Sequence, residues 1–393
     1  MPETDAHTAV IEDPAQVGID PGALAALVAR CHREVDEGLL PSSQMAVAAG
    51  DRIVAFETFG EAEPDSRYVI FSCTKAVVAG AFWLLLGDGA VTLDQRVAEL
   101  IPEFATNGKD VITVRQLLLH EGGFPQAPMN LATDRTREQR LARFSSWRLN
   151  WEPGTRFEYH ATSAHWVIAE LIEALSGVEY RTFIHERVLD PLGLTRLRVG
   201  VELADQGDIN DLAVRGEPPT NTELEQALGI SGITLADIQG EVTEEALVLF
   251  NEPEVREIGV PGGGGISTAA DLALYYQALL HNPDGMWDDA VLAAGTREVH
   301  GTHPDPWFKV SSNRALGTVI AGEGPDAAMR GFGRTVSPRS FGHAGAGGQI
   351  AFADPDADVS FCFFTNGLDR NMLRQGQRTA SIAGYVGRLT SAS

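Results

Sequence analysis

The chain has 393 residues, a formal net charge of −24 and an apolar fraction of 44%. This length and composition allow one large domain or two ordinary ones with a substantial core. The negative charge argues against nucleic acids and anionic membranes as partners. No run of about 18 apolar residues is present that would form a transmembrane helix.

The cysteines and the first residues bear on the cellular compartment. Cys31, Cys73 and Cys362 are too few for a disulfide framework. Residues 1–7 are acidic and lack the positively charged region and apolar stretch of a signal peptide. We therefore expect a cytoplasmic protein, and the sequence leaves its oligomeric state open.

The first predicted elements are a helix, two strands and a second helix. Residues 22–37 carry apolar side chains at helical spacing with charges on the other face, which predicts an amphipathic helix. Residues 45–49 and 53–59 flank Gly50–Asp51, a pattern typical of two strands joined by a tight turn. The apolar segment 74–87 predicts a buried helix.

Residues 91–285 carry mostly helical signals, including helices at 114–120, 164–175 and 269–280. Within this part, residues 201–258 contain 14 acidic residues against two arginines, Arg215 and Arg256. This acidic insertion is either a mobile cap over a site or a solvated surface segment.

Strand signals return at 316–321, 349–353 and 359–365, before a final helix over residues 371–388. We therefore predict an α+β fold with one antiparallel sheet, built from both chain ends and flanked by helices. Residues 20–90 and 300–393 would form this sheet subdomain. Residues 91–299 would form a mostly helical inserted subdomain that carries the acidic insertion.

The spacing of Ser72 and Lys75 is the first chemical signal. Only three lysines occur in the chain, and Lys75 follows Ser72 by three residues where the apolar helix starts. If that helix begins at Ser72, the two side chains share one face. Because apolar surroundings lower the pKa of a lysine, such a group can take the proton of a serine nucleophile. The alternative is that Ser72 only caps the helix.

Two further segments could complete such a site. Tyr159 follows a Pro-Gly turn and precedes a predicted helix, so its hydroxyl could point into a cleft or its ring could belong to the core. The glycines of residues 341–349 allow a ligand to approach the backbone closely, or they form a simple turn.

Three motifs together resemble those of the serine β-lactamase and penicillin-binding protein superfamily: Ser72-x-x-Lys75, Pro153-Gly-x-x-Phe157-x-Tyr159 and His343-Ala344-Gly345. The similarity is closest to the class C-like family VIII carboxylesterases and extends over residues 20–390. It implies a β-lactamase-like fold and a serine hydrolase that needs no cofactor and no metal.

The resemblance also implies roles for these residues. Ser72 would carry the acyl group, and Lys75 with Tyr159 would move the protons, with the identity of the general base left open. The backbone N–H groups of Ser72 and Ala346 would form the oxyanion hole. The segment His343-Ala344-Gly345 would bind the substrate.

Two departures from the family pattern narrow the expected substrate. Ala161 stands where many β-lactamases carry an asparagine, and His343 stands where a lysine holds a substrate carboxylate. We therefore expect a hydrolase of small uncharged carboxylic esters. A D-amino acid peptidase or amidase, a β-lactamase or an acyltransferase of the same fold is the alternative.

Other classes fit less well. The sequence has neither the Gly-x-Ser-x-Gly motif of an α/β-hydrolase nor a His-Glu-x-x-His zinc motif. A non-catalytic binding protein is a remote alternative, because Ser72, Lys75 and Tyr159 are all retained.

Overall fold

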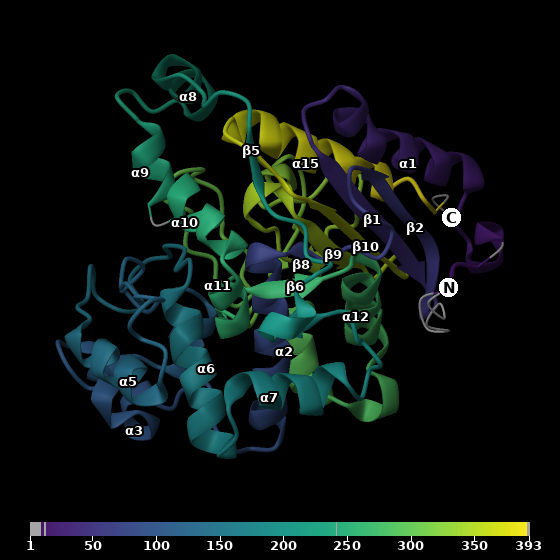
Figure 1. Ribbon diagram of the computed structural model, residues 1–393. Coiled ribbons are helices and arrows are strands. Elements are labelled where there is room, and N and C mark those ends of the chain that lie inside the picture. The colour runs from purple at the N-terminus through teal and green to yellow at the C-terminus, as the bar shows by residue number, and fades with distance from the viewer. Residues whose placement is uncertain (1–8, 12, 241, 391–393) are drawn as a thin grey trace.

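The computed structural model describes residues 9–11, 13–240 and 242–390, and Figure 1 shows their arrangement. A six-stranded antiparallel sheet has the strand order β2-β1-β10-β9-β8-β7, so both ends of the chain contribute to it, as predicted. Its strands are β1 (Ser42–Ala49), β2 (Arg52–Gly60), β7 (Val319–Ile320), β8 (Phe341–Gly342), β9 (Ile350–Asp354) and β10 (Val359–Thr365).

The central strands β1, β9 and β10 are buried along their whole length. In β1, Met45 and Val47 join one core with α1 (Pro21–Asp36) and α15 (Met372–Val386). Ala46 and Ala48 join the other core, with α2 (Thr74–Gly87) and α12 (Ala269–His281). Successive strand residues point to opposite faces, so helices cover both sides of the sheet. Figure 1 shows α1 and α15 on one side and α12 on the other.

Most of the remaining helices extend the molecule on the α2 side of the sheet (Figure 1). Between α2 and α12 lie α3 (Val97–Leu100), α4 (Val114–Leu118), α5 (Arg137–Ser146), α6 (Ser163–Ser176) and α7 (Tyr180–Ile184). The acidic insertion folds into α8 (Asn221–Leu228), α9 (Leu235–Gln239), α10 (Glu244–Val248) and α11 (Pro253–Ile258). Before the last strands lie α13 (Asp289–Thr296) and α14 (Asp326–Met329).

Two small sheets were not predicted. One has the order β3-β6-β4, and the other pairs β5 with β11. They consist of β3 (Tyr68–Val69), β4 (Arg198–Val199), β5 (Ala213–Arg215), β6 (Gly265–Ser267) and β11 (Gly367–Asp369). No helix in the described part of the chain is long and apolar enough to cross a membrane.

The apolar helix spans Thr74–Gly87, as predicted, and Ser72 lies just before it in a separate 3₁₀ turn over Phe71–Cys73, where Phe71 has a φ of 42°. Two other predicted boundaries need correction. The strand predicted at 316–321 shrinks to β7, since Gly317, with a φ of 103°, breaks the extended backbone. The helix expected near Tyr159 is α6, which begins at Ser163.

The last residue of α12 ties this helix to two turns of the sheet. His281 Nδ1 lies 3.1 Å from Asp51 in the β1–β2 turn, and its Nε2 lies 2.5 Å from Asp358 in the β9–β10 turn. Burial alone would lower the pKa of His281. The hydrogen bond to Asp358 and the two carboxylate charges outweigh burial and raise that pKa above its usual value.

His281→Gln should destabilise the protein at pH 5.5 and have little effect at pH 9. A group with a raised folded-state pKa stabilises fully below its unfolded pKa, and this stability is lost as the pH rises through the folded pKa. The contacts are partly exposed, so the loss should be about 1 kcal/mol or less. Thermal unfolding at both pH values measures it. Equal destabilisation at both pH values would contradict the assignment.

Candidate active site

Lys75 lies fully buried in the first turn of α2. Its Nζ is 3.1 Å from Ser72 Oγ, 2.7 Å from the carbonyl oxygen of Ala161 and 2.5 Å from that of Gly262. Burial, and then the positive charge of Arg314, hold the pKa of Lys75 well below its usual value. The surroundings therefore favour the neutral amine.

The two carbonyl groups determine whether the amine directs an N–H bond or its lone pair at Ser72. A neutral amine has two N–H bonds and one lone pair. When the carbonyls of Ala161 and Gly262 accept the two N–H bonds, the lone pair is left to face Ser72 Oγ. The serine hydroxyl can then donate to Nζ, which is the arrangement of a nucleophile beside its base.

Two glycines allow the separate segments to meet at this point. A Cβ atom at Gly262 would lie 2.8 Å from the carbonyl oxygen of Ala161. A Cβ atom at Gly345 would lie 2.6 Å from the carbonyl oxygen of Ile70, two residues before Ser72. Any larger residue would push these segments apart, so the glycine runs of the sequence serve close packing around the serine and lysine.

The predicted oxyanion donors are both free. Neither the Ser72 N–H nor the Ala346 N–H has an acceptor among residues 9–11, 13–240 and 242–390. Both residues line the same cavity. The strained left-handed φ of Phe71 immediately precedes Ser72, as is common beside functional groups. The two N–H groups could together bind an oxygen atom that gains negative charge.

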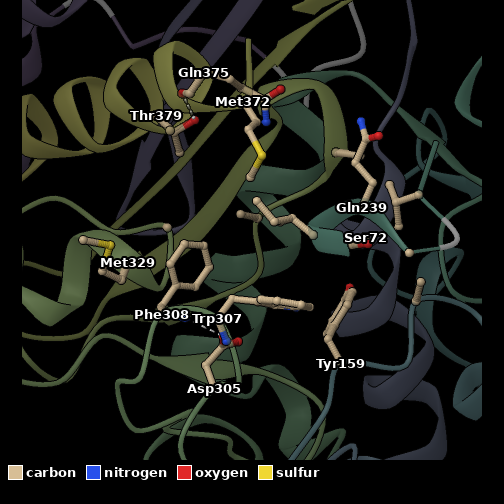
Figure 2. Close-up of a pocket in the computed structure, with 18 of the residues that line it drawn as sticks. Ser72, Tyr159, Gln239, Asp305, Trp307, Phe308, Met329, Met372, Gln375 and Thr379 are labelled. Atoms are coloured by element: carbon tan, nitrogen blue, oxygen red, sulfur yellow. Dashed lines mark hydrogen bonds between the residues drawn. The ribbon is translucent and has the colours of Figure 1, made fainter. Parts of the chain in front are cut away.

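Tyr159 lies in the irregular segment before α6, with its ring centroid 5.0 Å from Lys75 Nζ. Figure 2 shows its hydroxyl pointing toward Ser72. That buried hydroxyl has no partner with hydrogen-bond geometry in the described structure. Burial raises the pKa of Tyr159 to about 12, against the opposing effects of the Arg314 charge and the nearby Ser72 hydroxyl. Tyr159 is therefore protonated at neutral pH.

Arg314 is the residue of this site that the sequence did not reveal. It lies between α13 and β7, its side chain is buried, and its Nη1 donates to His343 Nε2 at 3.2 Å. The guanidinium lies 5.3 Å from the ring centroids of both Phe157 and Tyr159. Its Nε lacks a partner within the described structure. No motif marks this residue, which is one of 27 arginines.

His343 is held in one tautomer by its two neighbours. Its Nδ1 lies 2.7 Å from the carbonyl oxygen of Ala344, so Nδ1 carries the hydrogen and Nε2 accepts from Arg314. Burial, and then the charges of Arg314 and Lys75, hold the pKa of His343 well below its usual value. His343 itself is therefore neutral, as expected, but the adjacent Arg314 gives the site the positive charge that this histidine does not supply.

A cluster of buried histidines supports the loops beside Tyr159. His160 Nε2 accepts from the Phe124 N–H, and His120 Nδ1 accepts from the His160 N–H, both at 3.1 Å. These contacts fasten the segment after α4 to the segment before α6. In the part of the chain that the structure describes, no group of three or more histidine, cysteine or acidic residues could hold a metal ion.

Comparison with known proteins places the chain in a family. The β-lactamase family matches residues 26–384, so the chain belongs to that family. It is 28% identical to the Mycobacterium tuberculosis esterase/β-lactamase LipL, over 82% of this chain and 73% of that protein.

Solved structures share the fold. A penicillin-binding protein homologue from Caulobacter crescentus has a TM-score of 0.78 at 24% identity, covering 94% of this chain and 98% of that one. A family VIII carboxylesterase has a TM-score of 0.73 at 23% identity, covering 93% and 98%. The predicted family and α+β fold are thereby confirmed, and the protein is a serine hydrolase of the β-lactamase fold.

Arg314→Met should move the reactivity of Ser72 to higher pH. The Arg314 charge lowers the pKa of Lys75, so its removal raises that pKa and more of the lysine is protonated at a given pH. The rate at which a fluorophosphonate labels Ser72 is measured over a range of pH. The fall of this rate at low pH, which is the acid limb of the profile, should occur at a higher pH in Arg314→Met. An unshifted acid limb in Arg314→Met would refute the electrostatic role.

Proposed function

We propose that the protein hydrolyses uncharged carboxylic esters through an acyl-enzyme on Ser72. The observation that carries the proposal is the buried amine of Lys75. Its two N–H bonds have carbonyl acceptors, and its lone pair is left to face Ser72 Oγ. The ester class is supported by the similarity to a relative named as an esterase/β-lactamase and to the fold of a family VIII carboxylesterase.

In the first half of the reaction, Ser72 Oγ attacks the ester carbonyl as its proton passes to Lys75 Nζ. The carbonyl oxygen takes up negative charge between the N–H groups of Ser72 and Ala346. The bond to the alcohol oxygen then breaks. Tyr159 gives its proton to that oxygen and regains one from the Lys75 ammonium, so that both groups return to their starting states.

In the second half, water attacks the acyl carbonyl and gives a proton to Lys75. The bond to Ser72 Oγ breaks, and that oxygen receives the proton back by way of Tyr159 or directly from Lys75. Lys75 is assigned as the base because its neutral form is favoured, whereas Tyr159 has a pKa of about 12 and stays protonated.

Ser72→Ala and Lys75→Arg test this assignment together. Ser72→Ala should lower the hydrolysis of p-nitrophenyl butyrate by roughly a thousandfold or more and abolish fluorophosphonate labelling. Lys75→Arg keeps the positive charge but cannot serve as a base, so it should be as inactive as Lys75→Ala. Circular dichroism of each variant checks that the fold survives. Near-normal turnover by Ser72→Ala, or by Lys75→Arg, would overturn the mechanism.

A second candidate is the hydrolysis of β-lactams or of D-amino acid peptides and amides. Arg314 favours it, because a buried guanidinium with an unpaired Nε is suited to bind a substrate carboxylate. Ala161 argues against it. Its side chain offers no hydrogen bond, and its carbonyl oxygen already accepts from Lys75.

The specificity constants for p-nitrophenyl butyrate and nitrocefin distinguish the two candidates. The missing amide contact at Ala161 should leave nitrocefin slower by roughly one to two orders of magnitude. Arg314→Met should change this ratio little if the substrate is uncharged. If nitrocefin is the better substrate and Arg314→Met removes that preference, the second candidate replaces the first.

A further inference from the structure

The cavity in front of Ser72 is much larger than a small ester requires. It measures about 1500 Å³, is lined by both Ser72 and Tyr159, and extends to α9, α10, α14 and α15. Pockets for drug-sized ligands usually measure about 300–1,000 Å³. An acetyl or butyryl group would leave most of this space filled with water.

Large apolar side chains from separate elements face this space. Figure 2 shows Trp307 and Phe308 from one segment, Met329 from the end of α14 and Met372 from the start of α15 around the cavity that contains Ser72. Phe308 is 37% exposed and Met329 54% exposed. Phe308 is the one large aromatic side chain among the exposed apolar residues of the described structure. Apolar surface left open on a cavity wall is area that a bound apolar group would cover.

The segment that carries Trp307 and Phe308 is already held in place. Asp305 Oδ1 accepts from the Trp307 N–H at 2.8 Å and from the Phe308 N–H at 2.9 Å. The Asp305 N–H donates to the Val310 carbonyl at 2.8 Å and closes the turn. The backbone that carries the two aromatic rings is therefore fixed before any substrate enters, which reduces the conformational entropy lost on binding.

The opposite wall is supplied by the acidic insertion and is tied to the sheet subdomain. Arg370, next to β11, donates to both carboxylate oxygens of Glu244 in α10, at 2.6 and 2.8 Å. The Arg370 N–H also donates to the carbonyl of Arg215 in β5. These contacts hold α10 against β5 and β11, so the acidic insertion forms part of the cavity wall before any substrate binds.

The charges on the wall disfavour anionic substrates. Among the lining residues of the described chain, the carboxylates without an ion pair outnumber the guanidinium groups without one. The carboxylates belong to Glu217, Asp237, Glu245 and Asp305, and the guanidinium groups to Arg314 and Arg334. An excess of negative charge repels anionic groups and leaves apolar groups unaffected.

We propose that the substrate is an uncharged ester in which either the acyl group or the alcohol is bulky and apolar, such as a long alkyl chain or a fused aromatic ring system. That group would occupy the space between Trp307, Phe308 and the wall formed by α9, α10 and α15. The proposal rests on ester hydrolysis at Ser72 and enlarges the substrate expected from the sequence, which was a small ester.

Two ester series test this substrate class. One lengthens the acyl chain of p-nitrophenyl esters from acetate to octanoate, below their solubility limits. The other enlarges the alcohol of acetate esters from ethanol to 1-naphthylmethanol, and its rates are measured from the acetic acid released. Each buried methylene can add up to about fourfold to kcat/KM, so we expect a rise of at least about tenfold along one series. A flat or falling kcat/KM along both series would overturn the proposal.

Two variants connect the preference to the cavity. Trp307→Ala and Met372→Gln lie on different elements, and each should lower kcat/KM for the bulky substrate about tenfold or more while changing the smallest ester less than about threefold. Leu203→Ala, an exposed residue outside the cavity, is the matched control and should change neither. Equal losses for large and small esters in both variants would also overturn the proposal. If no ester is cleaved and Ser72 is not labelled, the proposed function itself has failed, whereas cleavage without a size preference refutes only this inference.

Discussion

The site depends on one constraint, which is that the amine of Lys75 is buried beside two backbone carbonyls and forms no ion pair with a carboxylate of the described residues. Of the 14 residues of α2, 12 are buried, and Lys75 is one of them. An isolated charge in such surroundings costs several kcal/mol, so the group gives up its proton instead. The lone pair of the neutral nitrogen can then accept the hydroxyl hydrogen of Ser72, whose Oγ lies 3.1 Å away. In the proposed mechanism the backbone carbonyls of residues 161 and 262 are therefore as important as the side chains, because they orient the lone pair of Lys75 toward Ser72.

Arg314 strengthens this constraint, because its positive charge also lowers the pKa of Lys75. Two buried cationic groups without a carboxylate repel each other, and arginine keeps its proton because its pKa is the higher of the two. The guanidinium is stabilised instead by the faces of Tyr159 and Phe157 and by His343 Nε2. A lysine in place of His343 could not accept that hydrogen bond and would add a third cation. His343 and Arg314 are thus best understood as one unit, in which the histidine orients the charge that the arginine carries.

Local patterns were sufficient to predict the elements whose burial repeats along the chain. The apolar residues 45–49 of β1 and the unbroken apolar run of α2 each indicate a buried element within a few residues, and the Ser72–Lys75 spacing lies within one turn. The role assigned to Ala346 came from family resemblance, because nothing local marks a free N–H group. Arg314 and Trp307 could not be predicted, since their positions beside Tyr159 and the cavity arise from contacts between segments far apart in the sequence. The separate 3₁₀ turn that holds Ser72 could not be predicted either, because the positive φ of Phe71 has no sequence signature in a non-glycine residue.

In the proposed mechanism Tyr159 is the proton donor, and its acidity gives a physical reason to expect esters to react more readily than amides. When an ester intermediate collapses, the departing alkoxide is far more basic than a phenolate, so Tyr159 can protonate it readily even with a pKa of about 12. An amide intermediate must instead have its nitrogen protonated before the C–N bond breaks, and an amine nitrogen is less basic than a phenolate, so Tyr159 alone would transfer that proton uphill. The Lys75 ammonium formed when Ser72 attacks, with its Nζ 5.0 Å from the tyrosine ring centroid, offsets this cost because it returns a proton to Tyr159. Arg314, over the tyrosine ring, keeps its charge throughout and stabilises the same phenolate character, so the two cations together determine how readily amides react at this site.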